Sequence, residues 1–264
     1  MSTPESVQTP AKFGFLYGKG SPHTARTLML EDLRGLFAYC APTGLSHEDF
    51  SMAILEDNCL AKRSGKTRSL TYQHLRELYA LDPKVPLFRV LLYLWTREEE
   101  GHALLAALCA FPRDPLFRRS FEWITKVPIG EQVTREAIET ELAAAFPDRF
   151  SPASLKSIAQ NLNSSWTKTG HLRGKVRKFR QKASPTPAST AFALYLGYLT
   201  GLRGESLFHS PYCRVLDASP SELMDKADAA SRRGWITMKR LGNIIEVSFP
   251  GLITSEERSL LNER

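Results

Sequence analysis

Residues 219–249 read SPSELMDKADAASRRGWITMKRLGNIIEVSF and carry the clearest indication of the fold class. A serine followed by proline starts a helix at residue 220, and apolar side chains at helical spacing continue it to Gly234. Two β-type runs follow, at residues 235–240 and 243–249, on either side of a Leu-Gly turn. A helix followed by such a hairpin is typical of the closing half of a winged-helix domain. The alternative is a plain hairpin added to a helical bundle.

The sequence before this stretch is predicted to be helical almost throughout. Residues 28–37 place apolar side chains on one helix face, and residues 85–95 are apolar nearly all round, as in a buried central helix. Residues 131–146 predict a further helix, and a serine–proline pair begins another that ends at Gly170. The predicted fold class is therefore mainly α: a multi-helix bundle with helix-turn-helix-like units and a small, winged-helix-like C-terminal β-hairpin.

Length and composition divide the 264 residues into three predicted regions. Residues 1–22 are rich in Ser, Thr, Pro and Gly and predict a flexible tail. Residues 23–148 predict an N-terminal helical domain with short connectors. Residues 149–264 predict a C-terminal basic domain that is helical and winged-helix-like.

Cysteine usage and hydropathy indicate a cytoplasmic protein. The four cysteines lie far apart without a C-x-x-C pair, which excludes an ordinary zinc finger and suits a reducing compartment. The longest apolar stretch, residues 191–202, is too short to cross a bilayer. The first twenty residues lack the apolar core of a secretory signal. We therefore expect no membrane partner.

The net charge of +7 is concentrated in one segment. Residues 149–204 contain ten Lys and Arg and no Asp or Glu, whereas a solvated surface normally mixes both signs. Such a block favours a polyanion such as DNA, whose phosphates release counterions when cations bind them. The alternative is a solvated linker. Within this segment the predicted DNA-binding residues are Lys168, Arg173, Lys175, Arg177, Lys178, Arg180 and Lys182, interleaved with Trp166 and Phe179.

Two further basic sites extend this prediction. In the segment, Gly170 and Gly174 would let backbone N–H groups approach a phosphate closely. A second patch lies in a connector, and a third lies beside the turn of the C-terminal hairpin. The predicted DNA-binding residues there are Lys62, Arg63, Lys66 and Arg68 in the connector, and Lys239 and Arg240 in the hairpin.

No catalytic pattern is found in the sequence. Residues 65–67 read Gly-Lys-Thr, but a phosphate-binding loop needs a glycine where this chain has Leu60. The six histidines form no H-x-x-x-H pair, and no G-x-S-x-G elbow is present. We expect a protein that is not an enzyme and binds no cofactor and no metal.

Several stretches between residues 24 and 172 together resemble the BrxA family of bacteriophage-exclusion (BREX) defence systems. The resemblance implies a non-catalytic DNA-binding protein that works beside a methyltransferase, an ATPase and a phosphatase-like protein. The chain departs from the family pattern in having Cys59 where the family has the first residue of a leucine pair, and in a larger basic stretch and C-terminal extension. The similar stretches are residues 25–31, residues 56–64 running into the helix at 71–78, residues 105–109 with 117–124, and residues 151–172.

The main functional hypothesis is a non-catalytic double-stranded DNA-binding accessory protein of a BREX-like system, which holds DNA largely through its phosphate backbone. One alternative is a winged-helix transcriptional regulator in which residues 221–233 enter the major groove. Another is an assembly or scaffold subunit whose basic strip meets an acidic protein partner.

Overall fold

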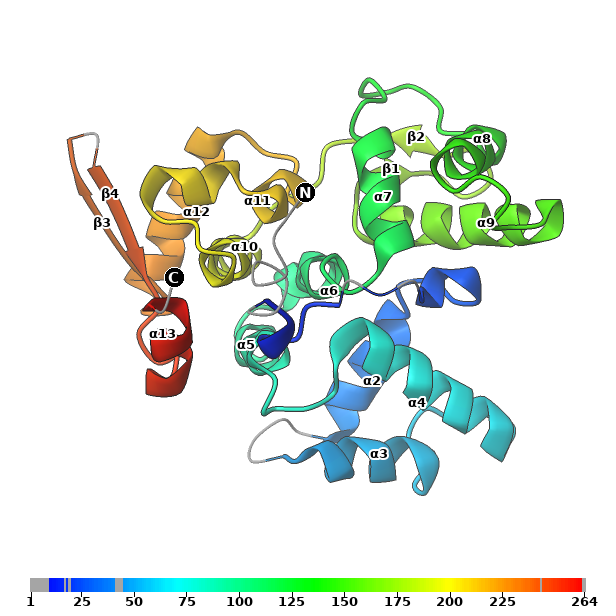
Figure 1. Ribbon diagram of the computed structural model, residues 1–264, viewed down its shortest axis with the longest axis horizontal. Coiled ribbons are helices and arrows are strands. Elements are labelled where there is room, and N and C mark those ends of the chain that lie inside the picture. Colours follow the sequence, from blue (N-terminus) through cyan, green and yellow to red (C-terminus); the bar gives the residue numbers. More distant parts are fainter. Residues whose placement is uncertain (1–9, 17, 19, 41–44, 243, 263–264) are drawn as a thin grey trace. The chain divides into compact units, whose positions relative to one another are not determined.

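The computed structural model describes residues 10–16, 18, 20–40, 45–242 and 244–262, and it is mainly helical (Figure 1). Two small antiparallel hairpins accompany the helices in the second half of the chain, so the predicted fold class is confirmed. The described residues form two compact units. Unit 1 comprises the described parts of residues 10–15, 85–108 and 183–262, and unit 2 those of residues 16–84 and 109–182.

The units interleave along the sequence and do not follow the predicted regions. The predicted boundary after residue 148 lies inside unit 2, between two helices that pack together, α8 (Arg135–Ala145) and α9 (Pro152–Lys168). The predicted tail is packed in its second half, where Phe13 and Phe15 are buried in unit 1. Burying the two aromatic side chains lowers the free energy of the folded chain by more than solvation of the surrounding polar residues does, and this part of the predicted tail is therefore packed.

Unit 1 is built on two helices that are buried nearly all round. Both α5 (Pro86–Trp95) and α10 (Pro187–Leu199) have proline in the first turn, and they pack against each other. Their apolar sequences leave no polar face, which confirms the prediction of a buried helix at residues 85–95. The remaining helices of this unit are η2 (Glu99–Gly101), α6 (His102–Ala110), which runs on into unit 2, η3 (Gly204–His209), α11 (Pro211–Val215), α12 (Pro220–Arg232) and α13 (Ser255–Asn262).

The C-terminal hairpin of unit 1 follows α12 as predicted. Strands β3 (Thr237–Leu241) and β4 (Ile244–Ser248) pair antiparallel, with Arg240 opposite Ile245. Trp235, Val247 and Phe249 are buried, so the base of the hairpin is anchored to the helices. Residue 243, where the second β-type run was predicted to begin, lies outside the described residues.

Unit 2 begins with helices that bury one face each, as the leucine spacing of residues 28–37 predicted. Helix α2 (Leu30–Cys40) packs on α3 (His47–Leu55), and α3 packs on α4 (Gly65–Tyr79). In this part of the unit, helices that are neighbours in the sequence therefore pack against each other. In the second half of the unit, α7 (Pro115–Ile124), α8 and α9 lie around the short hairpin of residues 172–180 (Figure 1). The elements of this unit besides α8 and α9 are η1 (Pro22–Thr24), α2 (Leu30–Cys40), α3 (His47–Leu55), α4 (Gly65–Tyr79), α7 (Pro115–Ile124), β1 (Leu172–Arg173) and β2 (Phe179–Arg180).

A third extended segment joins this hairpin. The Gly130 N–H donates to the Arg180 carbonyl over 2.9 Å, the Arg180 N–H donates to the Glu131 carbonyl over 2.8 Å, and the Val133 N–H donates to the Lys178 carbonyl over 2.9 Å. The sequence predicted a helix from residue 131, but α8 begins only at Arg135, behind the capping side chain of Thr134. Tertiary pairing has therefore overridden the helical pattern of residues 131–133.

The order of elements in the second half of unit 2 is helix, extended segment, helix, helix, strand, strand. These are α7, residues 130–133, α8, α9, β1 and β2, with the extended segment bridged to β2. This is the element order of a winged-helix domain, in which the third helix and the hairpin lie next to each other. The sequence placed the winged-helix signal at residues 219–249, whereas the more complete arrangement lies in unit 2.

Candidate nucleic-acid interface

The β1–β2 hairpin holds three cations of the basic segment in solvent. Arg173, Lys175 and Arg177 are exposed and form no ion pair with any described residue. Gly174 has a φ of 106°, and a Cβ atom at this position would lie 2.1 Å from the Arg177 carbonyl oxygen. Only glycine fits such a backbone, so Gly174 is required for the tight turn that presents these side chains.

Arg180 does not belong to this exposed set, and its predicted contact with DNA is wrong. The residue is 2% exposed, and its guanidinium donates to the backbone carbonyls of His171 and Gln181. The strand places Arg180 on the inner side of the hairpin because successive side chains of a strand point to opposite faces. The guanidinium therefore stabilises the turn that follows α9.

Replacing Arg180 with alanine is expected to destabilise the protein. Its loss removes hydrogen bonds from a charged donor to the His171 and Gln181 carbonyls, of which the His171 carbonyl keeps the Gln181 N–H, and costs about 1–3 kcal/mol of the free energy of unfolding. Replacing the exposed Arg177 is expected to change that free energy by less than about 0.5 kcal/mol. Urea unfolding of both variants measures the difference, and equal stabilities would contradict the structural role of Arg180.

Lys168 and Lys178 are also less available than predicted. The Lys178 Nζ donates to the Gly174 carbonyl over 2.7 Å, and partial burial lowers the pKa of this amine. Lys168 is half-buried, with its Nζ 3.5 Å from the Thr27 hydroxyl. Lys182 is exposed after the hairpin.

Trp166, one of the two aromatic residues predicted among these cations, belongs to the core. Trp166 is fully buried, stacks on Phe117 and donates from Nε1 to the Ser120 hydroxyl over 2.8 Å. Gly170 takes positive φ immediately after α9, where the His171 N–H donates to the Trp166 carbonyl and ends the helix. This glycine therefore has a local role in ending the helix.

The second basic patch is divided between structural and exposed cations. Lys62 pairs with Asp32 over 2.5 Å, and Arg68 donates to the carbonyl of Leu55 at the end of α3. These two predicted DNA-binding residues therefore hold unit 2 together. Arg63 and Lys66 remain exposed without an ion pair among the described residues.

The hairpin of unit 1 offers a weaker electrostatic site than predicted. Lys239 and Arg240 are exposed, but Lys239 stands directly opposite Glu246 across the strands. The residues next to the turn are apolar, with Leu241 80% and Ile244 70% exposed. The positive charge here is partly neutralised by Glu246 and interrupted by apolar side chains.

Helix α12, which precedes that hairpin, exposes three carboxylates and, at its end, the cation Arg232. Its exposed side chains include Glu222, Asp225 and Asp228, while Leu223 and Ala227 face the core. Carboxylates on the outer face of a helix repel the phosphates that flank a major groove. This face disfavours α12 as a helix that enters DNA.

The outer face of α9 has the opposite character. Lys156, Ser157 and Gln160 are exposed, and Ser164 is partly exposed on the same face. The whole helix, residues 152–168, contains no acidic residue. The face is neutral to positive and rich in hydrogen-bonding groups.

An open groove of about 380 Å³ connects this helix to the basic hairpin. Gln160, Asn163 and Ser164 line it from α9, Val176 and Lys178 line it from the hairpin, and residues 132–136, which include the carboxylate of Glu136, complete the lining. Asn163 is 8% exposed, and its Oδ1 atom has no hydrogen-bond partner in the described part of the chain. A buried acceptor without a donor costs free energy, so such a residue is typical of a site that a ligand completes.

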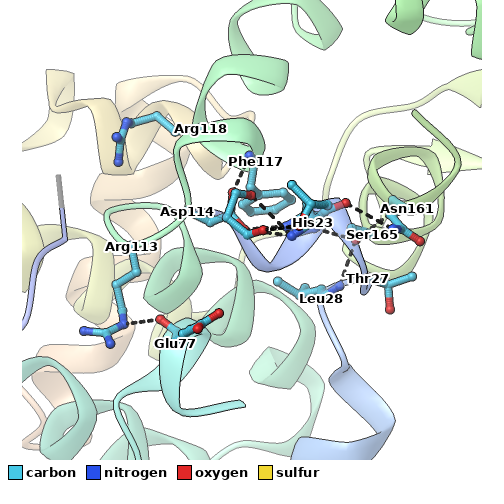
Figure 2. A network of polar contacts seen from close by, with 12 residues as sticks. His23, Thr27, Leu28, Glu77, Arg113, Asp114, Phe117, Arg118, Asn161 and Ser165 are labelled. Carbon is cyan, nitrogen blue, oxygen red and sulfur yellow. Dashed lines mark hydrogen bonds and ion pairs between the residues drawn. The ribbon is translucent and has the colours of Figure 1, made fainter. Parts of the chain in front are cut away.

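A buried polar network ties together three distant parts of unit 2 (Figure 2). The His23 Nδ1 lies 2.7 Å from the Asp114 carboxylate, and its Nε2 lies 2.9 Å from the Ser165 hydroxyl. Asp114 also accepts from the Ser21 hydroxyl and from the Phe117 N–H at the start of α7. The three central side chains have the residue types of a hydrolase triad.

The hydrogen bonds of this network differ from those of a triad. The Ser165 hydroxyl donates to the Asn161 carbonyl over 2.8 Å and accepts from the Leu28 N–H, so it accepts from His23 as well. Both ring nitrogens of His23 therefore have a buried hydrogen-bond partner, Nδ1 in the Asp114 carboxylate and Nε2 in the Ser165 hydroxyl. Since the Ser165 hydroxyl is also held by Asn161 and Leu28 and the three side chains are buried, we interpret the network as a structural junction.

Burial and hydrogen bonding act in opposite directions on Asp114. Desolvation raises the pKa of this carboxyl group, but the charge and hydrogen bond of His23 and the donor from Ser21 outweigh it. The net effect is a lowered pKa, so the carboxylate stays charged in the folded protein.

The sequence prediction missed the α9 face and the buried network. The α9 face could have been predicted from the sequence, because residues 151–182 contain a capped helix without acidic residues followed by a basic run. The buried network could not, because His23 and Ser165 are 142 positions apart.

The described residues contain no group of three His, Cys, Asp or Glu side chains placed to hold a metal ion. None of the described helices combines the length and apolarity needed to cross a membrane. No protein-family model matches the sequence, and no curated protein matches it. The function is therefore proposed from the chemistry of this surface and from the sequence resemblance.

Proposed function

We propose that this protein is a non-catalytic double-stranded DNA-binding protein that acts in the cytoplasm as an accessory component of a BREX-like phage-defence system. The observation that carries the proposal is the pairing of an exposed basic hairpin with an acid-free helix across one groove. Arg173, Lys175 and Arg177 are exposed on this hairpin and supply the charge, while α9 supplies polar surface across the groove, which the hairpin lines with Val176 and Lys178.

Duplex DNA fits this pairing by its dimensions and its charge. A major groove about 12 Å wide admits one α-helix, and its walls are continuous rows of phosphates. With α9 directed toward the groove, the hairpin beside it reaches the adjacent backbone. Phosphate contacts of this kind hold the protein on DNA and carry no sequence information directly.

The exposed face of α12 weighs against the regulator hypothesis in its original form. That hypothesis required residues 221–233 to enter the major groove, where Glu222, Asp225 and Asp228 would face phosphates. The β1–β2 hairpin has no such acidic neighbour on α9. We therefore assign DNA contact to unit 2 and a secondary role to Lys239 and Arg240.

The accessory role rests on the resemblance of residues 24–172 to BrxA. It implies partners of the methyltransferase, ATPase and phosphatase-like classes, with this chain supplying affinity for DNA. Cys59 in place of a leucine and the extended C-terminal region fit a divergent member of such a system.

Binding of the full chain to labelled duplexes across a salt series tests the proposal. Three phosphate contacts from the hairpin predict a slope of log affinity against log salt of about −2.7 or steeper between about 50 and 200 mM salt. Fluorescence anisotropy measures this slope. No duplex binding at the lowest salt, or a flat slope, would overturn the proposal, and stable capture of an acidic protein in its place would support a scaffold.

A further inference from the structure

The outer face of α9 is composed differently from an ordinary solvated helix face. Such faces usually carry charges of both signs, which keep the surface soluble. Among the exposed positions of α9, one face carries Ser157, Gln160 and, partly exposed, Ser164, with Lys156 beside them. These side chains offer hydrogen bonds without negative charge, which suits a surface that meets another polar molecule.

The face has the spacing of a base-reading surface. Residues 157, 160 and 164 lie on one side of the helix, each about one turn from the next. At 1.5 Å per residue they span about 10 Å, which matches about three base-pair steps of 3.4 Å. The two serines are short, so the helix backbone can approach base edges while the longer Gln160 side chain reaches them.

The neighbouring groove adds an independent observation. Asn163 lies three positions after Gln160 on α9 and lines the groove beside the hairpin, and its Oδ1 atom is buried without a partner among the described residues. The stability of the free protein gains nothing from this acceptor. A ligand or bridging water held between α9 and the hairpin would satisfy it.

From this arrangement we infer that α9 reads DNA sequence in the major groove, with Gln160 selecting adenine. The inference rests on the proposed function and extends it from phosphate contact to base recognition. A glutamine amide both donates and accepts, and it matches the N7 acceptor and N6 donor of adenine in a bidentate pair. Ser157 and Ser164 contact the flanking steps, where a hydroxyl tolerates more than one base.

Selection of bound duplexes from a randomised library by the full chain tests the inference. The wild type is expected to prefer adenine at one position by about 5- to 150-fold, the range of one good bidentate pair. Gln160→Ala should lose the preference at that position alone and keep its salt slope. Gln160→Glu should shift the preference toward cytosine, whose N4 amino group donates to a carboxylate.

Gln73→Ala is the matched control, because Gln73 is an exposed glutamine on α4 and bonds only within its own helix to Glu77. It should keep the wild-type preference. Duplex binding without any base preference, or a preference that survives in Gln160→Ala, would overturn the inference and leave the proposed function standing. Absence of duplex binding by the wild type would overturn both.

Discussion

Replacing Asp114 with alanine is expected to destabilise the protein by about 3–5 kcal/mol, the largest effect of any single substitution discussed. The change leaves His23 buried without its counter-ion and removes the acceptor for the Phe117 N–H at the start of α7. Because a domain of this size is stable by only about 5–15 kcal/mol, this loss brings unit 2 close to unfolding. Urea unfolding followed by tryptophan fluorescence measures it, since Trp166 is buried in the same unit.

An exposed ion pair provides the control for this substitution. Glu31 and Arg34 pair over 3.0 Å on the surface of α2, and Glu31→Ala should cost less than about 1 kcal/mol. Ser165→Ala should have an intermediate effect, because it removes the acceptor for the Leu28 N–H and for His23 but keeps the ion pair. An Asp114→Ala variant as stable as Glu31→Ala would contradict the assignment of the network as a junction.

The triple substitution of Arg173, Lys175 and Arg177 with alanine is expected to weaken duplex binding by roughly 100-fold at about 150 mM salt, at about 1 kcal/mol for each contact. The salt slope should flatten by up to about 2.7 units, because three phosphate contacts are lost. All sequences should be affected alike. The midpoint of thermal unfolding should remain unchanged, since the three side chains are exposed and unpaired among the described residues.

A second triple variant shows whether the loss of duplex binding comes from the hairpin contacts or from the lower net charge of the protein. Substituting alanine for Arg34, Arg76 and Arg119 removes the same number of exposed cations from other faces of unit 2. It should leave the salt slope near the wild-type value. Equal losses in both triple variants would show that net charge, rather than the hairpin, determines binding.

The basic segment illustrates how far sequence reading extends toward the site. The absence of acids in residues 149–204 correctly drew attention to the hairpin, and Arg173, Lys175 and Arg177 are exposed there. Arg180, a few positions on, is buried, and composition could not separate it from its neighbours. That distinction depends on which side of a strand faces the core, and the short strand was not predicted.

Local features of the chain were determined by the sequence itself. The starts of α9, α10 and α12 follow from a capping side chain and a proline in the first turn, and all three caps accept from a backbone N–H three residues on. The burial of α5 follows from its apolar residues, and the β3–β4 hairpin follows from two β-type runs around a glycine turn. These features depend on residues within a few positions of one another.

Other features were decided only by the tertiary structure. Residues 130–133 are extended because β2 offers them backbone partners, and Lys62 is held in an ion pair because folding places it against Asp32. Asp114 stays charged in the core because His23, 91 positions earlier, reaches it. A side chain's burial and charge depend on neighbours that only the folded chain brings into contact, and no local pattern of residues encodes them.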